Sequence, residues 1–66
     1  EFTPRQLEVL RELTSGETNA GIALRLGMSP ITVRNHIQKM LEITGFENRT
    51  SLAVAADKSG LVSRDF

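Results

Sequence analysis

Residues 19–38, NAGIALRLGMSPITVRNHIQ, decide the fold of this chain. The stretch predicts two short helices joined by a tight turn. Ala23 is small enough for two helices to cross closely, Gly27 falls in the turn, and Val33 would point back at the first helix. Glycine is common in such turns because it tolerates a positive φ without a Cβ clash. The spacing therefore indicates a helix-turn-helix, with an ordinary αα-hairpin in a small bundle as the alternative.

The bulk composition favours one small domain covering residues 1–66. This length is near the lower limit at which a hydrophobic core holds a fold together alone. Hydrophobic residues make up 39% and charged residues 24%, which is ordinary for a soluble globular domain. There is no cysteine, no apolar run long enough for a membrane span and no signal-peptide pattern. We therefore expect an intracellular, cytoplasmic protein.

The net charge is zero, with eight basic and eight acidic residues, which counts against a nucleic-acid partner. The distribution of the charges weakens that objection. Residues 18–50 hold four basic residues against two acidic ones. The modest positive charge thus surrounds the predicted hairpin, with the sign that faces phosphates.

Capping signals define a first helix. Thr3 can cap the free N–H groups, Pro4 suits the first helical position, and Gln6 can complete a capping box. Apolar residues then recur at helical spacing until a polar stretch that ends at Gly16. The pattern predicts a helix over residues 4–14.

The hairpin helices have their own start signals. Thr18 or Asn19 caps a second, short helix, in which Gly21 costs about 1 kcal/mol relative to alanine. Ser29 followed by Pro30 predicts the start of a third helix. That helix continues to residue 44, where the next residue is glycine.

A fourth helix is predicted over residues 49–59, with Asn48 as its cap. Phe46 is expected to cover the end of the core, and Leu61 and Val62 to fold back on it. The fold class is therefore all-α, a four-helix bundle that contains the helix-turn-helix.

The third helix has one packing face and one wet face, at about 100° per residue. We expect the packing face to hold Val33, Ile37, Met40, Leu41 and Thr44. The wet face carries amides, a hydroxyl and cations, which can address base edges and phosphates. A merely solvated face would carry the same groups.

Sites of other classes are missing from the sequence. His36 is the single histidine and has no carboxylate partners at ligand spacing, so no metal site and no cofactor are predicted. We expect His36 to be half-buried. No nucleophile with a base, no carboxylate pair and no phosphate-binding glycine loop is present, so the chain is not expected to be an enzyme.

Small residues on the fourth helix make a low-relief surface. Dimerisation with a second copy and plain internal packing are both compatible with it. The candidate dimer residues are Ala53, Val54, Ala56 and Asp57.

Between residues 2 and 62, the chain carries a series of short motifs whose order and spacing match those of a known protein family. They are Phe2-Thr3-Pro4-Arg5-Gln6 with Val9-Leu10, Gly16, Asn19, Ile22-Ala23, Leu26, Met28-Ser29, Thr32-Val33-Arg34, His36, and Gly45-Phe46 with Asn48-Arg49. Together they resemble the C-terminal DNA-binding domain of the LuxR/FixJ/GerE family of bacterial transcription regulators.

The resemblance implies a third helix in the major groove of double-stranded DNA and a homodimer formed through the fourth helix on paired half-sites. It implies base contacts by Arg34, Asn35 and Gln38. It implies backbone contacts by Thr18, Asn19, Ser29, Thr32, Lys39 and Arg49. Full regulators of this family usually carry an N-terminal sensing or receiver domain, so the chain would be a piece of one or a small stand-alone regulator.

Three departures from the family pattern concern affinity more than fold. Gly21 replaces an acidic residue that usually completes a capping box, so the second helix is expected to fray. Glu42 and Ile43 replace a frequent basic pair, and Gln6 replaces a glutamate. We therefore expect weak binding by a monomer and a dependence on avidity between two copies.

Two rival interpretations remain. A helical protein-interaction module could use the same exposed face on a protein groove. The fourth region of a bacterial sigma factor contains a similar hairpin, although the Thr-Val-Arg-x-His and Gly-Phe-x-Asn-Arg runs favour the LuxR-type interpretation.

Overall fold

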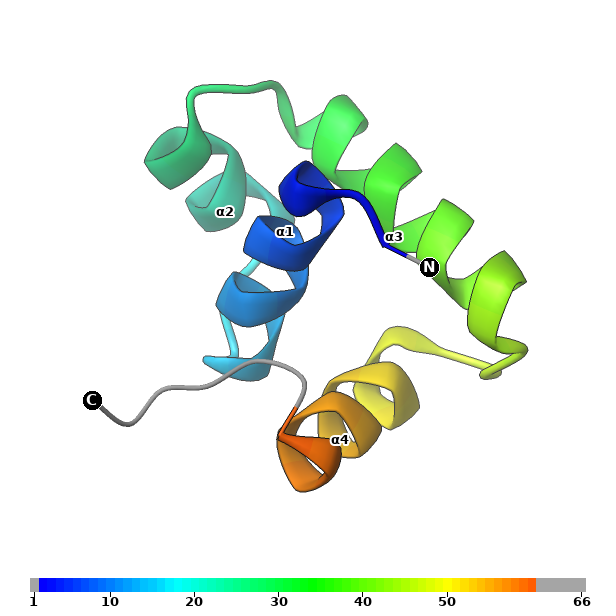
Figure 1. The fold of residues 1–66 in the computed structure, drawn as a ribbon. Coiled ribbons are helices and arrows are strands. Elements are labelled where there is room, and N and C mark those ends of the chain that lie inside the picture. Colours follow the sequence, from blue (N-terminus) through cyan, green and yellow to red (C-terminus); the bar gives the residue numbers. More distant parts are fainter. Residues whose placement is uncertain (1, 61–66) are drawn as a thin grey trace.

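In the computed structural model, which describes residues 2–60, four α-helices follow one another along the chain (Figure 1). The first helix, α1, lies between the other three and packs against each of them. The predicted fold class is confirmed, whereas Leu61 and Val62 lie outside the described residues. No helix within residues 2–60 is long and apolar enough to cross a bilayer. The helices are α1 (Pro4–Thr14), α2 (Asn19–Leu26), α3 (Pro30–Thr44) and α4 (Arg49–Ser59).

The capping box of α1 is present as predicted. The Gln6 N–H donates to Thr3 Oγ1 at 3.1 Å, and the Thr3 N–H donates to Gln6 Oε1 at 2.9 Å. Gln6 is buried, so an amide in place of the family's glutamate completes the box without placing a charge in the core. Two of the free N–H groups at the helix start are thereby satisfied.

Thr18 is the cap of α2, and its Oγ1 accepts from the Gly21 N–H at 3.1 Å. The helix is formed from Asn19 onward, and the fraying of its first turn stays a prediction. The Glu17 carboxylate occupies the space that a Cβ at Gly21 would need. Glu17 therefore brings a negative charge to the first turn of α2, where the helix dipole favours one. The absent side chain of Gly21 makes room for it.

The turn between α2 and α3 depends on Gly27. Its φ of 69° lies in the left-handed region, and the Met28 N–H donates to the Ala23 carbonyl at 3.0 Å. This is the hydrogen bond of a Schellman turn, in which glycine avoids the Cβ penalty. Arg5 satisfies one more carbonyl at this helix end, since its Nη2 donates to the Leu26 oxygen at 2.6 Å.

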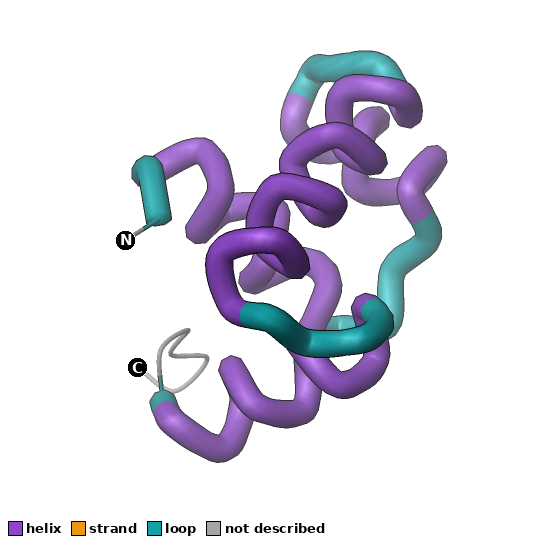
Figure 2. The backbone as a smooth tube through the Cα atoms, turned by 90° about the vertical axis from the view of Figure 1, so that its right-hand side faces the viewer, coloured by secondary structure: helices purple, strands orange, loops and turns teal. Residues whose placement is uncertain are grey.

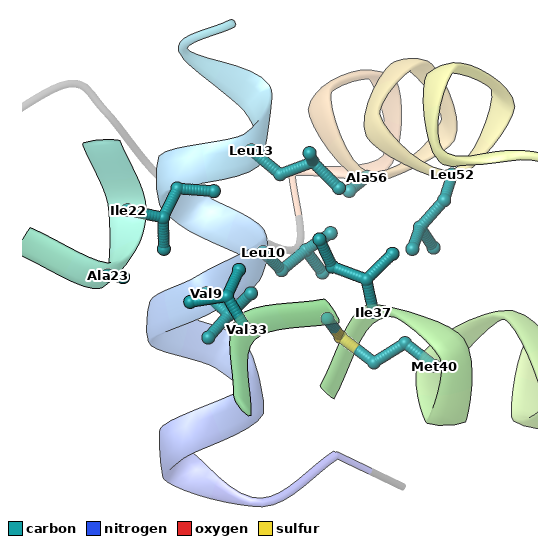
Figure 3. Close-up of a cluster of buried hydrophobic side chains, with 10 residues drawn as sticks. All are labelled: Val9, Leu10, Leu13, Ile22, Ala23, Val33, Ile37, Met40, Leu52 and Ala56. Atoms are coloured by element: carbon teal, nitrogen blue, oxygen red, sulfur yellow. The ribbon is translucent and has the colours of Figure 1, made fainter. Parts of the chain in front are cut away.

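Apolar side chains from all four helices meet in one core (Figure 3). Ala23 and Val33 are 3% and 0% exposed, which confirms the close crossing expected of α2 and α3. The largest fully buried side chains are Leu10, Ile22, Met40, Val9 and Val33.

The packing face predicted for α3 includes one residue, Thr44, that the structure does not bury. Val33, Ile37 and Met40 are buried and Leu41 is half-buried, but Thr44 is exposed. Thr44 lies in the last turn, and its hydroxyl donates to the Met40 carbonyl at 2.8 Å. A threonine there satisfies a carbonyl of the helix end instead of filling the core.

Phe46 covers the core less than expected, because its side chain is 39% exposed. It lines an apolar hollow together with Phe2, Leu52 and Ala56. One side of its ring therefore faces the bundle and the other faces solvent. The α3–α4 connection runs across the end of the core instead of through it.

Candidate functional site

The outer side of α3 is an exposed surface of the hairpin that carries mostly polar side chains. Figure 2 looks onto this helix, which lies in front of the other three. Val33, Ile37 and Met40 point inward and fix the rotation of the helix about its axis. Its outer side is thereby left open to a partner. The exposed residues of the first three turns are Pro30, Ile31, Thr32, Arg34, Asn35, Gln38 and Lys39.

Helical geometry orders these residues across the face. At 3.6 residues per turn, Ile31, Asn35 and Gln38 fall within roughly 60° of one another, opposite the buried stripe. Arg34 and Lys39 fall on either side of this central strip, separated by roughly 140°. The arrangement is a strip of amide and apolar groups flanked by two cations.

The two cations of α3 differ from two arginines elsewhere on the domain. Arg5 forms an ion pair with Glu8, its Nη1 lying 2.6 Å from the carboxylate oxygen. Arg25 lies 3.4 Å from a Glu12 oxygen and 3.2 Å from a Glu17 oxygen. No hydrogen bond or ion pair within residues 2–60 holds the side chains of Arg34 or Lys39. They are the hairpin cations whose charge is not balanced by an ion pair in the described part of the chain.

The ion pairs of Arg25 change the picture given by the charge balance of residues 18–50. Arg25 contributed to the positive balance of residues 18–50, but Glu12 and Glu17 lie outside that window and neutralise it locally. Of the basic residues within the hairpin, those without an ion pair therefore lie on α3. They are Arg34 and Lys39, and Glu42 lies a further turn along the same helix.

The start of α2 presents polar donors beside α3. Arg49 Nη1 donates to Asn19 Oδ1 at 2.6 Å, and its Nη2 donates to the Glu17 carbonyl at 3.3 Å. Arginine carries no acceptor, so the oxygen of the Asn19 amide must face it and the amide nitrogen is left as a donor. Thr18 likewise uses its oxygen as an acceptor in the cap, which leaves its O–H as a donor.

A shallow hollow of about 260 Å³ joins these elements. Four predicted site residues line it, from α2, α3 and the start of α4. The fold thus gathers groups up to 30 residues apart in the sequence around one concave surface. These four residues are Asn19, Arg34, Gln38 and Arg49.

Ser29 and Thr32 are exposed at the start of α3, where they were predicted to meet the DNA backbone. The Thr32 N–H donates to Ser29 Oγ at 3.1 Å, and the two hydroxyl oxygens are 3.0 Å apart. One hydroxyl donates to the other, so the pair keeps one O–H for a partner. Ser29 and Thr32 therefore both cap the start of α3 and supply the hydroxyl groups predicted to contact the DNA backbone.

Arg49 has an internal role that the sequence did not reveal. It was predicted to contact the backbone of DNA. The structure places it half-buried, tying the start of α4 to the start of α2. Its partners are 30 and 32 residues away, too far for any local pattern to indicate them.

The low-relief surface of α4 is smaller than predicted. Ala56 is 4% exposed and belongs to the core, so its side chain is not on the surface. Ala53 is half-buried and packs against that core. Val54, which is 49% exposed, and Asp57 remain on the outer side.

His36 is half-buried, as expected for a residue that flanks the packing face. Among residues 2–60 no group of three or more His, Cys, Asp or Glu side chains could hold a metal ion. The candidate site is therefore built from amides, hydroxyls and guanidinium and ammonium groups.

One exposed residue of the α3 strip was missed by the sequence reasoning. Ile31 is 64% exposed although it is a large apolar side chain. Its spacing to Arg34, Asn35 and Gln38, at i+3, i+4 and i+7, could have placed it on their face. The search for polar groups passed over it.

The Arg49 bridge yields a stability prediction. Replacing Arg49 with Gln should lower the free energy of unfolding by about 1–3 kcal/mol, because two hydrogen bonds from a charged, half-buried donor are lost. Urea denaturation followed by circular dichroism measures this change. The free energy of unfolding of Arg49→Lys should lie between those of wild type and Arg49→Gln, since one ammonium group replaces the two-pronged guanidinium. Lys58→Gln, an exposed cation on the same helix, is the control and should shift stability by less than about 0.5 kcal/mol. Equal stability of Arg49→Gln and wild type would refute the bridge.

Comparison with known proteins agrees with this geometry. The family model for bacterial regulatory proteins of the luxR family matches residues 1–56. The chain is 38% identical over 61 residues to the uncharacterized transcriptional regulatory protein YxjL of Bacillus subtilis, covering 92% of this chain and 28% of that protein. It is 35% identical over 60 residues to the two-component response regulator PprB of Pseudomonas aeruginosa, covering 91% and 22%. It is 36% identical over 61 residues to the regulatory protein SdiA of Escherichia coli, covering 92% and 25%.

The chain spans about a quarter of the length of these relatives. No solved structure gave a significant match. The family comprises transcription regulators and is not an enzyme family. The match over residues 1–56 confirms the resemblance seen in the sequence motifs and decides against the sigma-factor alternative: the chain belongs to the luxR family of bacterial regulatory proteins.

Proposed function

We propose that this domain binds double-stranded DNA in a sequence-specific manner, with α3 in the major groove, as part of a bacterial transcription regulator. The observation that carries the proposal is the outer strip of α3, flanked by Arg34 and Lys39. Phosphates line both edges of a groove, and a helix that enters it presents its centre to the bases and its sides to the backbone. Membership of the luxR family supports the same function.

Arg34, Asn35 and Gln38 are the proposed base contacts. Asparagine and glutamine amides match the donor and acceptor pattern of adenine, and the guanidinium fork matches guanine. Arg34 also faces the hollow shared with Asn19, so it stands between base edges and backbone. All three side chains are exposed.

Thr18, Asn19, Ser29, Thr32 and Lys39 are the proposed backbone contacts. The starts of α2 and α3 each present hydroxyl or amide donors, and helix N-termini favour anions. Arg49 contributes by holding Asn19 with its amide nitrogen free to donate, and its positive charge lies at the same hollow. We propose that Arg49 acts mainly by positioning.

We further propose a homodimer on paired half-sites, formed through α4 around Val54 and Asp57. Support comes from the exposure of Val54, an apolar residue on a helix whose inner side is already packed. A single copy presents few unpaired cations, and Glu42 adds a repulsive charge on α3. Two linked copies would raise the overall affinity without any new type of contact.

In the complete protein we place a sensing or receiver domain before this one, and the protein in the bacterial cytoplasm, where the DNA lies. PprB is named as a two-component response regulator, and this chain covers 22% of its length, which leaves room for such a domain. The proposal for the complete protein rests on that likeness alone.

The first prediction from the proposed function concerns the attraction between the α3 cations and phosphates. Arg34→Ala should weaken binding to a mixed-sequence duplex and reduce the slope of log K against log salt by about 1, because a cation that stands between base edges and phosphates is lost. Fluorescence anisotropy at several salt concentrations measures the affinity and its salt dependence. Lys58→Ala removes the same charge from the last turn of α4 and should leave the slope unchanged. Circular dichroism would confirm that each variant is folded. Binding of no duplex by the folded wild type, even at low salt, would overturn the proposal in favour of a protein-interaction module.

The second prediction separates base contacts from backbone contacts. Gln38→Ala should change the sequences recovered from a random duplex library, because an amide that pairs with a base edge is removed. Thr18→Ala should weaken binding to all sequences about equally, after allowance for a loss of roughly 1 kcal/mol of helix stability. Identical recovered motifs for Gln38→Ala and wild type would remove Gln38 from the base contacts.

The third prediction concerns the dimer. Val54→Gln should lower affinity for a duplex with paired half-sites by about tenfold or more and leave single half-site binding unchanged, because only avidity is lost. Ile43→Gln is the matched control: Ile43 is 46% exposed, against 49% for Val54, but lies in the last turn of α3. Sedimentation of the protein–DNA complexes would report their stoichiometry. Nanomolar binding of one half-site by a monomer would contradict the dependence on avidity.

A further inference from the structure

Ile31 is a large apolar side chain in the middle of a polar surface. It is the second residue of α3 and is 64% exposed. It lies roughly 40° around the helix from Asn35 and roughly 20° from Gln38, between the flanking cations Arg34 and Lys39. The proposed DNA-contacting strip therefore begins, at the N-terminal end of α3, with an apolar side chain.

The fold itself does not use this side chain. Ser29 caps the helix, and Met28, the residue before the cap, is the one that packs against the core. Val33 fills the inward position of the same turn and is fully buried. A β-branched residue also gains nothing in helix propensity over the alanine, lysine or glutamate that would suit an exposed position.

Its place in the helix determines what it can meet. The N-terminal residues of a recognition helix are those that approach base edges. Along the axis, Ile31 precedes Asn35 by about 6 Å, less than two base-pair steps. The groove presents one apolar group, the C5-methyl of thymine, and apolar side chains contact it.

We propose that Ile31 is a specificity-determining residue that packs against a thymine methyl group in the major groove, at a base pair next to those addressed by Asn35 and Gln38. This inference rests on the proposed function. The contact would bury apolar surface on both partners, so it favours thymine over cytosine without a hydrogen bond. It adds a base preference that the polar residues of the strip cannot supply.

Deoxyuridine provides a direct test, because it pairs as thymine does but lacks the methyl group. A duplex selected by the wild-type protein from a random library would be resynthesised with each thymine replaced in turn by deoxyuridine. Fluorescence anisotropy would measure the affinity of each duplex for wild type, Ile31→Val and Ile31→Ala. Leu24→Ala is the matched control, since Leu24 is an apolar residue 85% exposed on α2, off the α3 strip.

At one thymine, the wild type should lose affinity by a factor of about three to five on removal of the methyl group, the effect of burying about one carbon. Ile31→Ala should bind the thymine and deoxyuridine duplexes equally, whereas Ile31→Val should keep part of the difference and Leu24→Ala all of it. A difference that is the same in Ile31→Ala and wild type, or absent at every thymine, would overturn the inference and leave the proposed function standing. Failure of the folded wild type to select any duplex would overturn both.

Discussion

The close crossing of α2 over α3 is the constraint on which the other features depend. Ala23 and Val33 are buried at this crossing, and the Schellman turn at Gly27 fixes how the chain passes from one helix to the next. A larger residue in place of Ala23 would push the helices apart, since protein cores are close-packed. The rotation of α3 follows from the same contacts. Its polar strip faces outward because its apolar stripe has nowhere else to pack.

Internal pairing divides the cations of the domain by role. Arg5, Arg25 and Arg49 are held by carboxylates, carbonyls or an amide, and they link helices to one another. Arg34 and Lys39 have no such partner within the described residues. A net charge of zero therefore does not mean a neutral surface. The unbalanced charges of Arg34 and Lys39 flank the exposed strip of α3, where a polyanion would be attracted to them.

One departure from the family pattern, Gly21, is accommodated by a neighbouring group. Gly21 lacks the acidic side chain expected there, but the Glu17 carboxylate occupies the space beside it and supplies the charge. Glu17 also connects two helices, because its carboxylate pairs with Arg25 of α2 and its carbonyl accepts from Arg49 of α4. One short segment before α2 thus helps to hold α2 and α4 in their relative places.

Local sequence signals were enough to predict the helices, because caps, prolines and glycines act over three or four residues. Thr3 with Gln6, Ser29 with Pro30, and Asn48 define helix starts that the structure confirms at the predicted residues. The buried stripe of α3 followed from its helical period, apart from Thr44, which lies exposed in the last turn. Only the folded domain reveals the pairing of Arg49 with Asn19, the neutralisation of Arg25 and the burial of Ala56. Each of these depends on how separate helices are placed against one another, and no local period or spacing contains that information.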